Sequence, residues 1–229
     1  MLALARARAY ASAAAASSRP AVLWLHGLGD TGAGWQGAFQ GVDLQGVAFH
    51  HPTAPRAPVT INGGMLSTSW MDLKTFPVDL SEPDAGEDFD ATIKSVHAML
   101  QDIEAGGTKS EQIVIGGFSQ GGATSIAAGL AYPRQLAGIV SISGWAAYRS
   151  DFASRVHEAN RAVPMLFTCG TGDPVVDHSL CERSGELVKE AIGDAVTVMD
   201  VQRSMHQPNQ AEMAAVFKFI AARLGDVEA

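Results

Sequence analysis

Six short apolar runs alternate with longer amphipathic stretches along most of this chain, and this alternation restricts the fold more than any other feature. The runs span residues 21–27, 46–52, 112–118, 138–144, 163–170 and 196–201. They are rich in Val, Ile and Leu without clean polar alternation, which is typical of parallel strands buried on both faces. Stretches with helical spacing of apolar residues span 87–107, 121–133, 178–193 and 207–225. The order predicts the α/β class, with a mostly parallel central sheet and helices on both faces.

Residues 1–20 differ in composition from everything that follows them. They are rich in Ala, Arg and Ser and contain no acidic residue. Both an organellar transit peptide and an alanine-rich tail without an address have this composition. Residues 21–229 are enough for one domain. Within it, residues 52–86 form a long insertion rich in Pro and apolar side chains, which favours packing over an apolar pocket.

Charge and cysteine content exclude several classes of protein. The net charge is −8, so we expect no nucleic-acid partner, because such proteins present a basic surface. No uninterrupted apolar run is long enough to predict a transmembrane helix. The only cysteines are Cys169 and Cys181, which we interpret as reduced residues in a strand and a helix. The cysteines and histidines show no metal-ligand spacing, so no metal site is expected.

The segment "IVIGGFSQGG", residues 113–122, places Ser119 between glycines where a strand ends and a helix begins. Gly-x-Ser-x-Gly in this context is typical of a nucleophile elbow. The small neighbours permit a sharp turn that holds the serine in a strained backbone conformation. A nucleophile at a helix N-terminus is also favoured by nearby N–H groups as negative charge develops. An ordinary strand-to-helix turn is the simpler alternative.

A serine nucleophile needs a base and an acid, which follow it in the order Ser, Asp, His in α/β-hydrolases. Asp173 comes just after the apolar run 163–170, and His206 just after the run 196–201. His206 would take the proton from Ser119, and Asp173 would orient and stabilise the imidazolium. The sequence leaves three alternatives open, namely His178 for the base and Asp177 and Asp200 for the acid.

Two backbone N–H groups are candidates for an oxyanion hole. One belongs to Gln120, the residue after the serine, and the other should come from the loop after an early strand. The segment "HGLGDTG", residues 26–32, is such a loop, and Leu28 is the candidate within it. The glycines of this loop also fit an ordinary turn between a strand and a helix.

The segments "LHGLGDTG", "SWMD", "GGFSQGG", "GDPVV" and "MHQ...EM" occur in order over residues 21–225. Together they resemble the acyl-protein thioesterases, also described as lysophospholipases or carboxylesterases of the α/β-hydrolase superfamily. The resemblance implies the α/β-hydrolase fold, a triad of Ser119, Asp173 and His206, and an oxyanion hole at Leu28 and Gln120. It also implies no metal or organic cofactor, and removal of long acyl chains from cysteine thioesters on proteins, with some lysophospholipids and simple esters accepted.

By the same resemblance, an acyl channel would involve Trp145, Val175, Met65 and Leu66. Trp145 is equally typical of ordinary core packing. The chain departs from the family at Gly170, where relatives commonly have histidine, and in its glycine-rich segment around Met65. Chain-length preference is therefore expected to differ from that of relatives.

The combined prediction is a serine hydrolase of acyl thioesters, acting on acylated proteins or lipid esters, with S-palmitoyl-cysteine as the expected substrate. The alternative is a carboxylesterase or lysophospholipase that acts on short-chain or lipid oxygen esters. A non-catalytic lipid-binding protein on the same scaffold is a rival from another class. The expected location is the cytoplasm, or a plastid or mitochondrion if residues 1–20 are a transit peptide.

Overall fold

The computed structural model describes residues 19–40, 42, 44 and 46–225. Its centre is a six-stranded sheet in which every neighbouring pair of strands is parallel. In spatial order the strands are β2 (Ala48–His50), β1 (Ala21–Leu25), β5 (Ile113–Phe118), β6 (Gly138–Ile142), β7 (Met165–Gly170) and β8 (Val196–Val201). The predicted α/β class with a parallel sheet is confirmed, since each predicted apolar run contains one of these strands.

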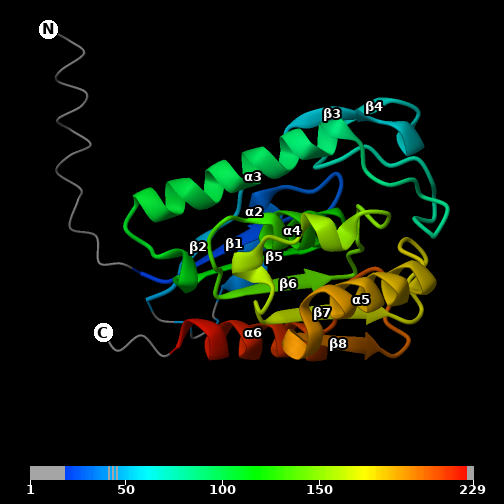
Figure 1. The fold of residues 1–229 in the computed structure, drawn as a ribbon. Helices are drawn as coiled ribbons and strands as arrows, with labels where there is room; N and C mark the ends of the chain where they lie inside the picture. The colour runs from blue at the N-terminus through cyan, green and yellow to red at the C-terminus, as the bar shows by residue number, and fades with distance from the viewer. Residues whose placement is uncertain (1–18, 41, 43, 45, 226–229) are drawn as a thin grey trace, which may run out of the picture.

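Helices cover both faces of the sheet, as Figure 1 shows. One face carries α3 (Glu87–Ala105), α4 (Gln120–Ala131) and α5 (His178–Ile192), and the other carries α2 (Gly32–Phe39) and α6 (Gln210–Leu224). Alternate residues of one strand pack into the two layers: Leu23 of β1 faces α3 and α4, whereas Trp24 faces α2 and α6. This double burial explains why the strand runs lack polar alternation. Short 3₁₀ turns span Thr60–Asn62, Ser110–Gln112, Phe152–Arg155, Glu158–Asn160 and Gly193–Ala195.

Helix α2 has no counterpart among the predicted helices. Its eight residues include three glycines, which are poor helix formers, so local propensity argues against it. Tertiary packing overrides that propensity, because Trp35 and Phe39 bury their rings against Trp24 of β1. Thr31 caps the helix by accepting a hydrogen bond from the N–H of Gly34.

The predicted insertion 52–86 contains a two-stranded antiparallel hairpin, β3 (Arg56–Val59) and β4 (Met65–Thr68), separate from the main sheet. Figure 1 shows it at one end of α3. The rest of the segment is irregular, but Trp70, Leu73 and Val78 are buried. The expectation that these apolar residues pack holds for those three. Leu66, Phe76 and Leu80 are more than half exposed.

The predicted leader, residues 1–20, lies almost entirely outside the described residues, which begin at residue 19. Among the described helices, none combines the length and the apolar character needed to cross a membrane.

Candidate active site

Ser119 lies in the tight turn between β5 and α4 and has φ 56° and ψ −122°. A positive φ is strained for a side chain with a Cβ, and such strain is typical of functional turns. The neighbouring glycines make the turn possible. A Cβ on Gly121 would lie 2.2 Å from the Leu25 carbonyl oxygen, and one on Gly117 would lie 2.5 Å from the backbone of Gly121. Any side chain there would push the turn off β1.

The structure brings Ser119, His206 and Asp173 together. His206 Nε2 lies 2.8 Å from Ser119 Oγ, and His206 Nδ1 lies 2.7 Å from Asp173 Oδ2. Each residue follows a different strand of the sheet, so the three meet at the carboxyl edge although 87 positions separate the first from the last. This geometry allows Nδ1–H to donate to the carboxylate while Nε2 accepts the serine proton.

Asp173 is held in place from two sides. Its Oδ1 accepts hydrogen bonds from the backbone N–H groups of Val175 and Val176, at 2.8 and 3.0 Å, while Oδ2 faces His206. Burial alone would raise the pKa of Asp173, but His206 and the two N–H donors hold it below its ordinary value. The carboxylate therefore stays ionised, as a partner for an imidazolium must.

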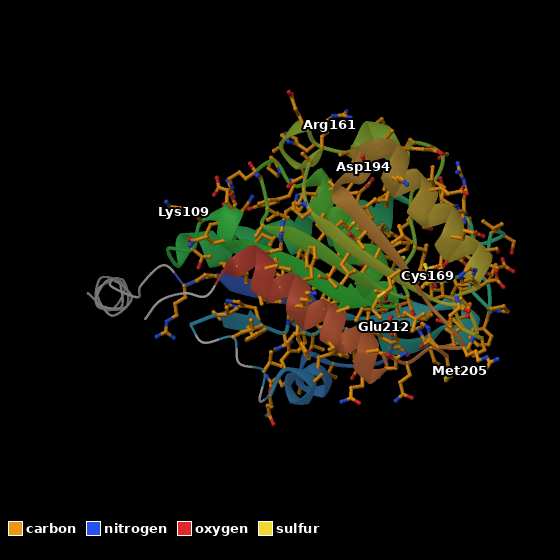
Figure 2. The ribbon with its side chains drawn as sticks, turned by 90° about the horizontal axis from the view of Figure 1, so that it is seen from below. Lys109, Arg161, Cys169, Asp194, Met205 and Glu212 are labelled. Atoms are coloured by element: carbon orange, nitrogen blue, oxygen red, sulfur yellow. A yellow bond between two sulfur atoms is a disulfide. The ribbon has the colours of Figure 1, made fainter. Side chains whose placement is uncertain are left out.

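The His206 loop, residues 202–209, joins β8 to α6 and docks on the loop that carries Asp173. The N–H of Gly172 donates to the Ser204 carbonyl oxygen at 3.1 Å. The imidazole also packs on Phe118, with ring centroids 4.7 Å apart. Figure 2 shows Met205 in this loop and Glu212 near the start of α6 on the same side of the molecule. Backbone contact and ring packing together fix the imidazole beside the serine.

Glu212 is a buried residue to which the sequence analysis gives no role. Its carboxylate accepts a hydrogen bond from the Thr168 hydroxyl of β7 and completes a capping box with Asn209 at the start of α6. Burial raises the pKa of Glu212, and the nearby Asp173 carboxylate adds to the rise. The contact ties the helix after His206 to the strand before Asp173. The capping-box spacing of Asn209 and Glu212 was the available sequence signal.

The loop with Leu28 lies directly against the serine turn. A Cβ on Gly27 would come within 3.5 Å of the Ser119 Cβ. In the part of the chain that the structure describes, no acceptor is paired with the backbone N–H of Leu28 or of Gln120. Two unpaired donors beside a nucleophile are what an oxyanion hole requires.

A cavity of about 430 Å³ opens at Ser119. Its lining is mostly apolar and includes Leu28, Ile61, Leu73, Phe76, Val78 and Val175. Of the four predicted substrate-binding residues, only Val175 is in this lining. Trp145 is buried nearby against Leu73 and Val176. Met65 and Leu66 lie on β4, with 67% and 57% of their surface exposed.

The alternative acid and base residues have other partners. His178 Nε2 pairs with Asp200 Oδ1 at 3.3 Å. Asp177 caps α5 by accepting from the N–H of Ser179 at 2.9 Å. Neither contact involves Ser119. The described residues contain no group of three or more His, Cys, Asp or Glu side chains that could hold a metal ion.

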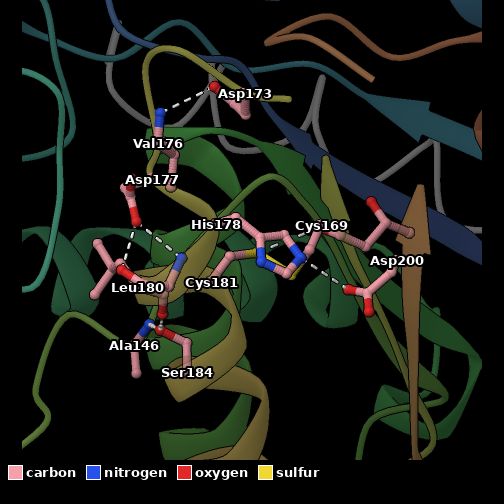
Figure 3. The surroundings of a disulfide bond; sticks show 12 residues. Ala146, Cys169, Asp173, Val176, Asp177, His178, Leu180, Cys181, Ser184 and Asp200 are labelled. Carbon is pink, nitrogen blue, oxygen red and sulfur yellow. Dashed lines mark hydrogen bonds and ion pairs between the residues drawn. A yellow bond between two sulfur atoms is a disulfide. The ribbon is translucent and has the colours of Figure 1, made fainter. Parts of the chain in front are cut away.

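Cys169 and Cys181 form a disulfide bond, so the expectation of two reduced cysteines is wrong. Their assignment to a strand and a helix is correct, since they lie in β7 and α5. The helix folds back along the strand and brings the two Cα atoms to 5.9 Å, a separation that permits a disulfide. Figure 3 shows the bond beneath the turn that carries Asp173. A spacing of twelve residues gives no periodic signal of this pairing.

Comparisons with known proteins find carboxylesterases and acyl-protein thioesterases both by sequence and by structure. Carboxylesterase SOBER1 of Arabidopsis thaliana is 35% identical in sequence over 76% of this chain and 78% of its own length. The crystal structure of SOBER1 matches with a TM-score of 0.84 and 32% identity, covering 90% of this chain and all of that one. Acyl-protein thioesterase 1 of Cryptococcus neoformans is 36% identical over 75% of this chain and 74% of its own length. The crystal structure of Zea mays acyl-protein thioesterase 2 has a TM-score of 0.80 at 27% identity, covering 92% of this chain and 96% of that one.

The profile of the phospholipase/carboxylesterase family matches residues 8–224, which is nearly the whole chain. Sequence, fold and profile therefore agree with the resemblance stated above, and the chain belongs to the phospholipase/carboxylesterase family of α/β-hydrolases.

Proposed function

We propose that this protein is a serine hydrolase of acyl thioesters and esters in which Ser119, His206 and Asp173 form a catalytic triad. The observation that carries the proposal is the pair of contacts of His206, 2.8 Å to Ser119 Oγ and 2.7 Å to Asp173 Oδ2. The names of the relatives, a carboxylesterase and acyl-protein thioesterases, support the same reaction class.

The reaction has two halves. Ser119 Oγ attacks the acyl carbonyl carbon while its proton passes to His206 Nε2. The C–S or C–O bond then breaks, and the imidazolium donates that proton to the leaving thiolate or alkoxide. In the second half, water gives a proton to His206 and attacks the acyl-enzyme, and Ser119 leaves with the proton returned.

The negative oxygen of each tetrahedral intermediate would be bound by the backbone N–H groups of Leu28 and Gln120. Their lack of another acceptor within the described residues supports this role. Losing one such donor typically costs about 10²–10³ in kcat.

For the substrate, we propose S-palmitoyl-cysteine on proteins. The apolar cavity at Ser119 supports a hydrocarbon chain as the acyl group. The alternative is a carboxylesterase or lysophospholipase that acts on short-chain or lipid oxygen esters, which the name of the Arabidopsis relative favours. Val175 is the predicted channel residue that lines the cavity, and we propose that it contacts the acyl chain. Trp145 would support this lining from behind, since it belongs to the same cluster as Leu73 and Val78. Met65 and Leu66 would contact only a chain that extends beyond the cavity.

The deciding experiment measures kcat/KM for matched acyl thioesters and oxygen esters of two to sixteen carbons. A rise toward long thioesters supports depalmitoylation. A maximum at two to four carbons supports a short-chain esterase. The Ser119→Ala protein serves as the control in both series, and equal turnover by that control would contradict the proposal as a whole.

Two features of the chain, its first twenty residues and its disulfide, bear on the location of the protein. The sequence predicts the cytoplasm, or a plastid or mitochondrion if residues 1–20 act as a transit peptide. The disulfide between Cys169 and Cys181 counts against the cytoplasm, where disulfides are rare. Expression of the full chain with a C-terminal fluorescent tag, followed by fractionation, distinguishes these locations.

A further inference from the structure

The loop with Leu28 is hydrogen-bonded to one short segment of the chain, residues 68–71, which we call the clamp segment. On one side of Leu28, the Trp70 indole Nε1–H donates to the His26 carbonyl oxygen at 2.9 Å. On the other side, the N–H of Gly29 donates to the Thr68 carbonyl oxygen at 2.9 Å. The Thr68 hydroxyl adds a bond to the Asp30 carbonyl oxygen at 2.6 Å. The backbone is therefore fixed at His26, two residues before Leu28, and at Gly29 and Asp30 directly after it.

The same clamp segment is fixed to the other candidate donor. The side-chain amide of Gln120 is completely buried. Its Oε1 accepts from the N–H of Trp70 at 2.7 Å, and its Nε2 donates to the Met71 carbonyl oxygen at 2.6 Å. The backbone N–H of that same Gln120 is the second candidate oxyanion donor. One segment thus connects both donors through hydrogen bonds.

The surroundings leave the clamp segment little freedom. Trp70 is 2% exposed, and its carbonyl oxygen accepts a bond from the Thr92 hydroxyl of α3 at 2.7 Å. His26 Nε2 accepts from the N–H of Ala54 at 2.9 Å, which requires a neutral ring. Burial lowers the pKa of His26, in agreement with that neutral state.

We infer that the clamp segment sets the separation of the Leu28 and Gln120 N–H groups, with Trp70, Thr68 and the Gln120 side chain as positioning residues for the oxyanion hole. This inference rests on the proposed function. None of these side chains needs to touch the substrate. Their effect is confined to the transition state, because misplacing a donor weakens binding of the oxyanion more than binding of the neutral ester.

The test compares two buried tryptophans. Trp70→Phe removes the indole donor to His26 and keeps an aromatic ring. Trp24→Phe is the matched control, because Trp24 is equally buried but its Nε1 has no partner among the described residues. We expect Trp70→Phe to lower kcat about 10- to 100-fold with KM within about twofold, and Trp24→Phe to change kcat less than about twofold. Affinity for a trifluoromethyl ketone, which mimics the oxyanion, should fall by the same factor as kcat/KM.

A second pair of variants keeps the inference testable if Trp70→Phe does not fold. Thr68→Val removes the hydroxyl bond to Asp30 at nearly constant volume, and Thr68→Ser retains it. We expect a lower kcat for Thr68→Val and recovery in Thr68→Ser. Equal kcat for the two tryptophan variants would overturn the inference. If Trp70→Phe does not fold, equal kcat for the two Thr68 variants would overturn it instead.

Hydrogen exchange separates failure of the inference from failure of the proposed function. The backbone amides of residues 26–30 should exchange faster in Trp70→Phe than in Trp24→Phe, whatever reaction the protein catalyses. If Ser119→Ala hydrolyses esters as fast as the wild type, the proposed function fails. The exchange difference then still tests whether the clamp segment holds the Leu28 loop in place, and unchanged exchange in residues 26–30 would show that it does not.

Discussion

The serine turn, residues 113–122, and the insertion, residues 52–86, meet at one cavity but are built in different ways. The serine turn is almost completely buried, and its glycines touch the backbone of β1. The insertion is partly exposed, and its hairpin joins no strand of the main sheet. The conformation of the serine turn depends on its glycines, because larger residues would clash with β1. The conformation of the insertion depends on the residues against which its buried side chains pack. We therefore expect changes in the serine turn to cost far more than changes at the exposed positions of the insertion.

The largest effect on activity is expected at the serine itself. Ser119→Ala removes the proposed nucleophile without adding volume, so kcat should fall by at least about 10³-fold with an unchanged circular dichroism spectrum. Turnover of a chromogenic ester measures the loss. Residual activity within tenfold of the wild type would contradict the proposed role.

The next largest effect is expected on the free energy of unfolding when a side chain is added at Gly121 in the serine turn. Gly121→Val should destabilise the protein by about 3 kcal/mol or more, because a Cβ would lie 2.2 Å from the Leu25 carbonyl oxygen. Gly86→Ala in the insertion is the matched control, since its Cβ would meet nothing within 4 Å. That change should cost no more than about 1 kcal/mol, because Gly86 is the N-cap of α3 and Ala is a poorer N-cap than Gly. Urea unfolding of both variants measures their free energies of unfolding. Equal decreases in the two variants would contradict the difference between the serine turn and the insertion.

The disulfide is expected to contribute about 2–3 kcal/mol. It joins two residues twelve positions apart and closes a loop that includes Asp173, and such a crosslink restricts the unfolded chain. Intact mass before and after reduction should differ by two hydrogens, and the reduced protein should unfold at lower urea concentration. Identical urea midpoints would show that the bond adds nothing to stability.

A smaller effect is expected from ionisation of Asp173. Its pKa is held below the unfolded value of 3.8, so its carboxylate stabilises the fold above that pH, and this contribution is lost as the pH falls through the folded pKa. The stability difference between the wild type and Asp173→Asn should be constant above about pH 5 and shrink below pH 4. Urea unfolding at several pH values measures it. A difference that grows as the pH falls would have the wrong sign.

The smallest effect is expected on the exposed strand β4 of the hairpin. Leu66→Ser replaces a side chain that is 57% exposed, so stability should change by less than about 0.5 kcal/mol. Hydrolysis of two-carbon esters should be unaffected. A loss confined to sixteen-carbon substrates would instead show that the hairpin contacts long acyl chains.

The sequence predicts the sheet and the serine turn because their signals are local. Continuous apolar runs reflect burial on both faces, and the glycines around Ser119 reflect the space that the turn allows. Asp173 and His206 could be proposed because each follows a predicted strand, and in the structure His206 contacts both Ser119 and Asp173.

The remaining features depend on contacts between distant segments. Helix α2 forms in spite of its glycines because Trp35 packs on Trp24. The bond between Cys169 and Cys181 depends on the return of α5 along β7. The hairpin at residues 56–68 does contain a turn signal, Asn62-Gly63, but its loop is five residues long and its first strand contains Pro58, which argues against a strand. Burial of Trp145 in the same cluster as the cavity-lining Leu73 and Val78 likewise depends on its neighbours and not on its residue type.

The most direct test of the central claim is covalent labelling by a fluorophosphonate, followed by intact mass and peptide mapping. We predict one label per chain, located on Ser119, and strongly reduced labelling in His206→Ala because the proton acceptor is gone. Labelling of another residue, or none in a folded and unmodified protein, would contradict the assignment of Ser119 as the nucleophile.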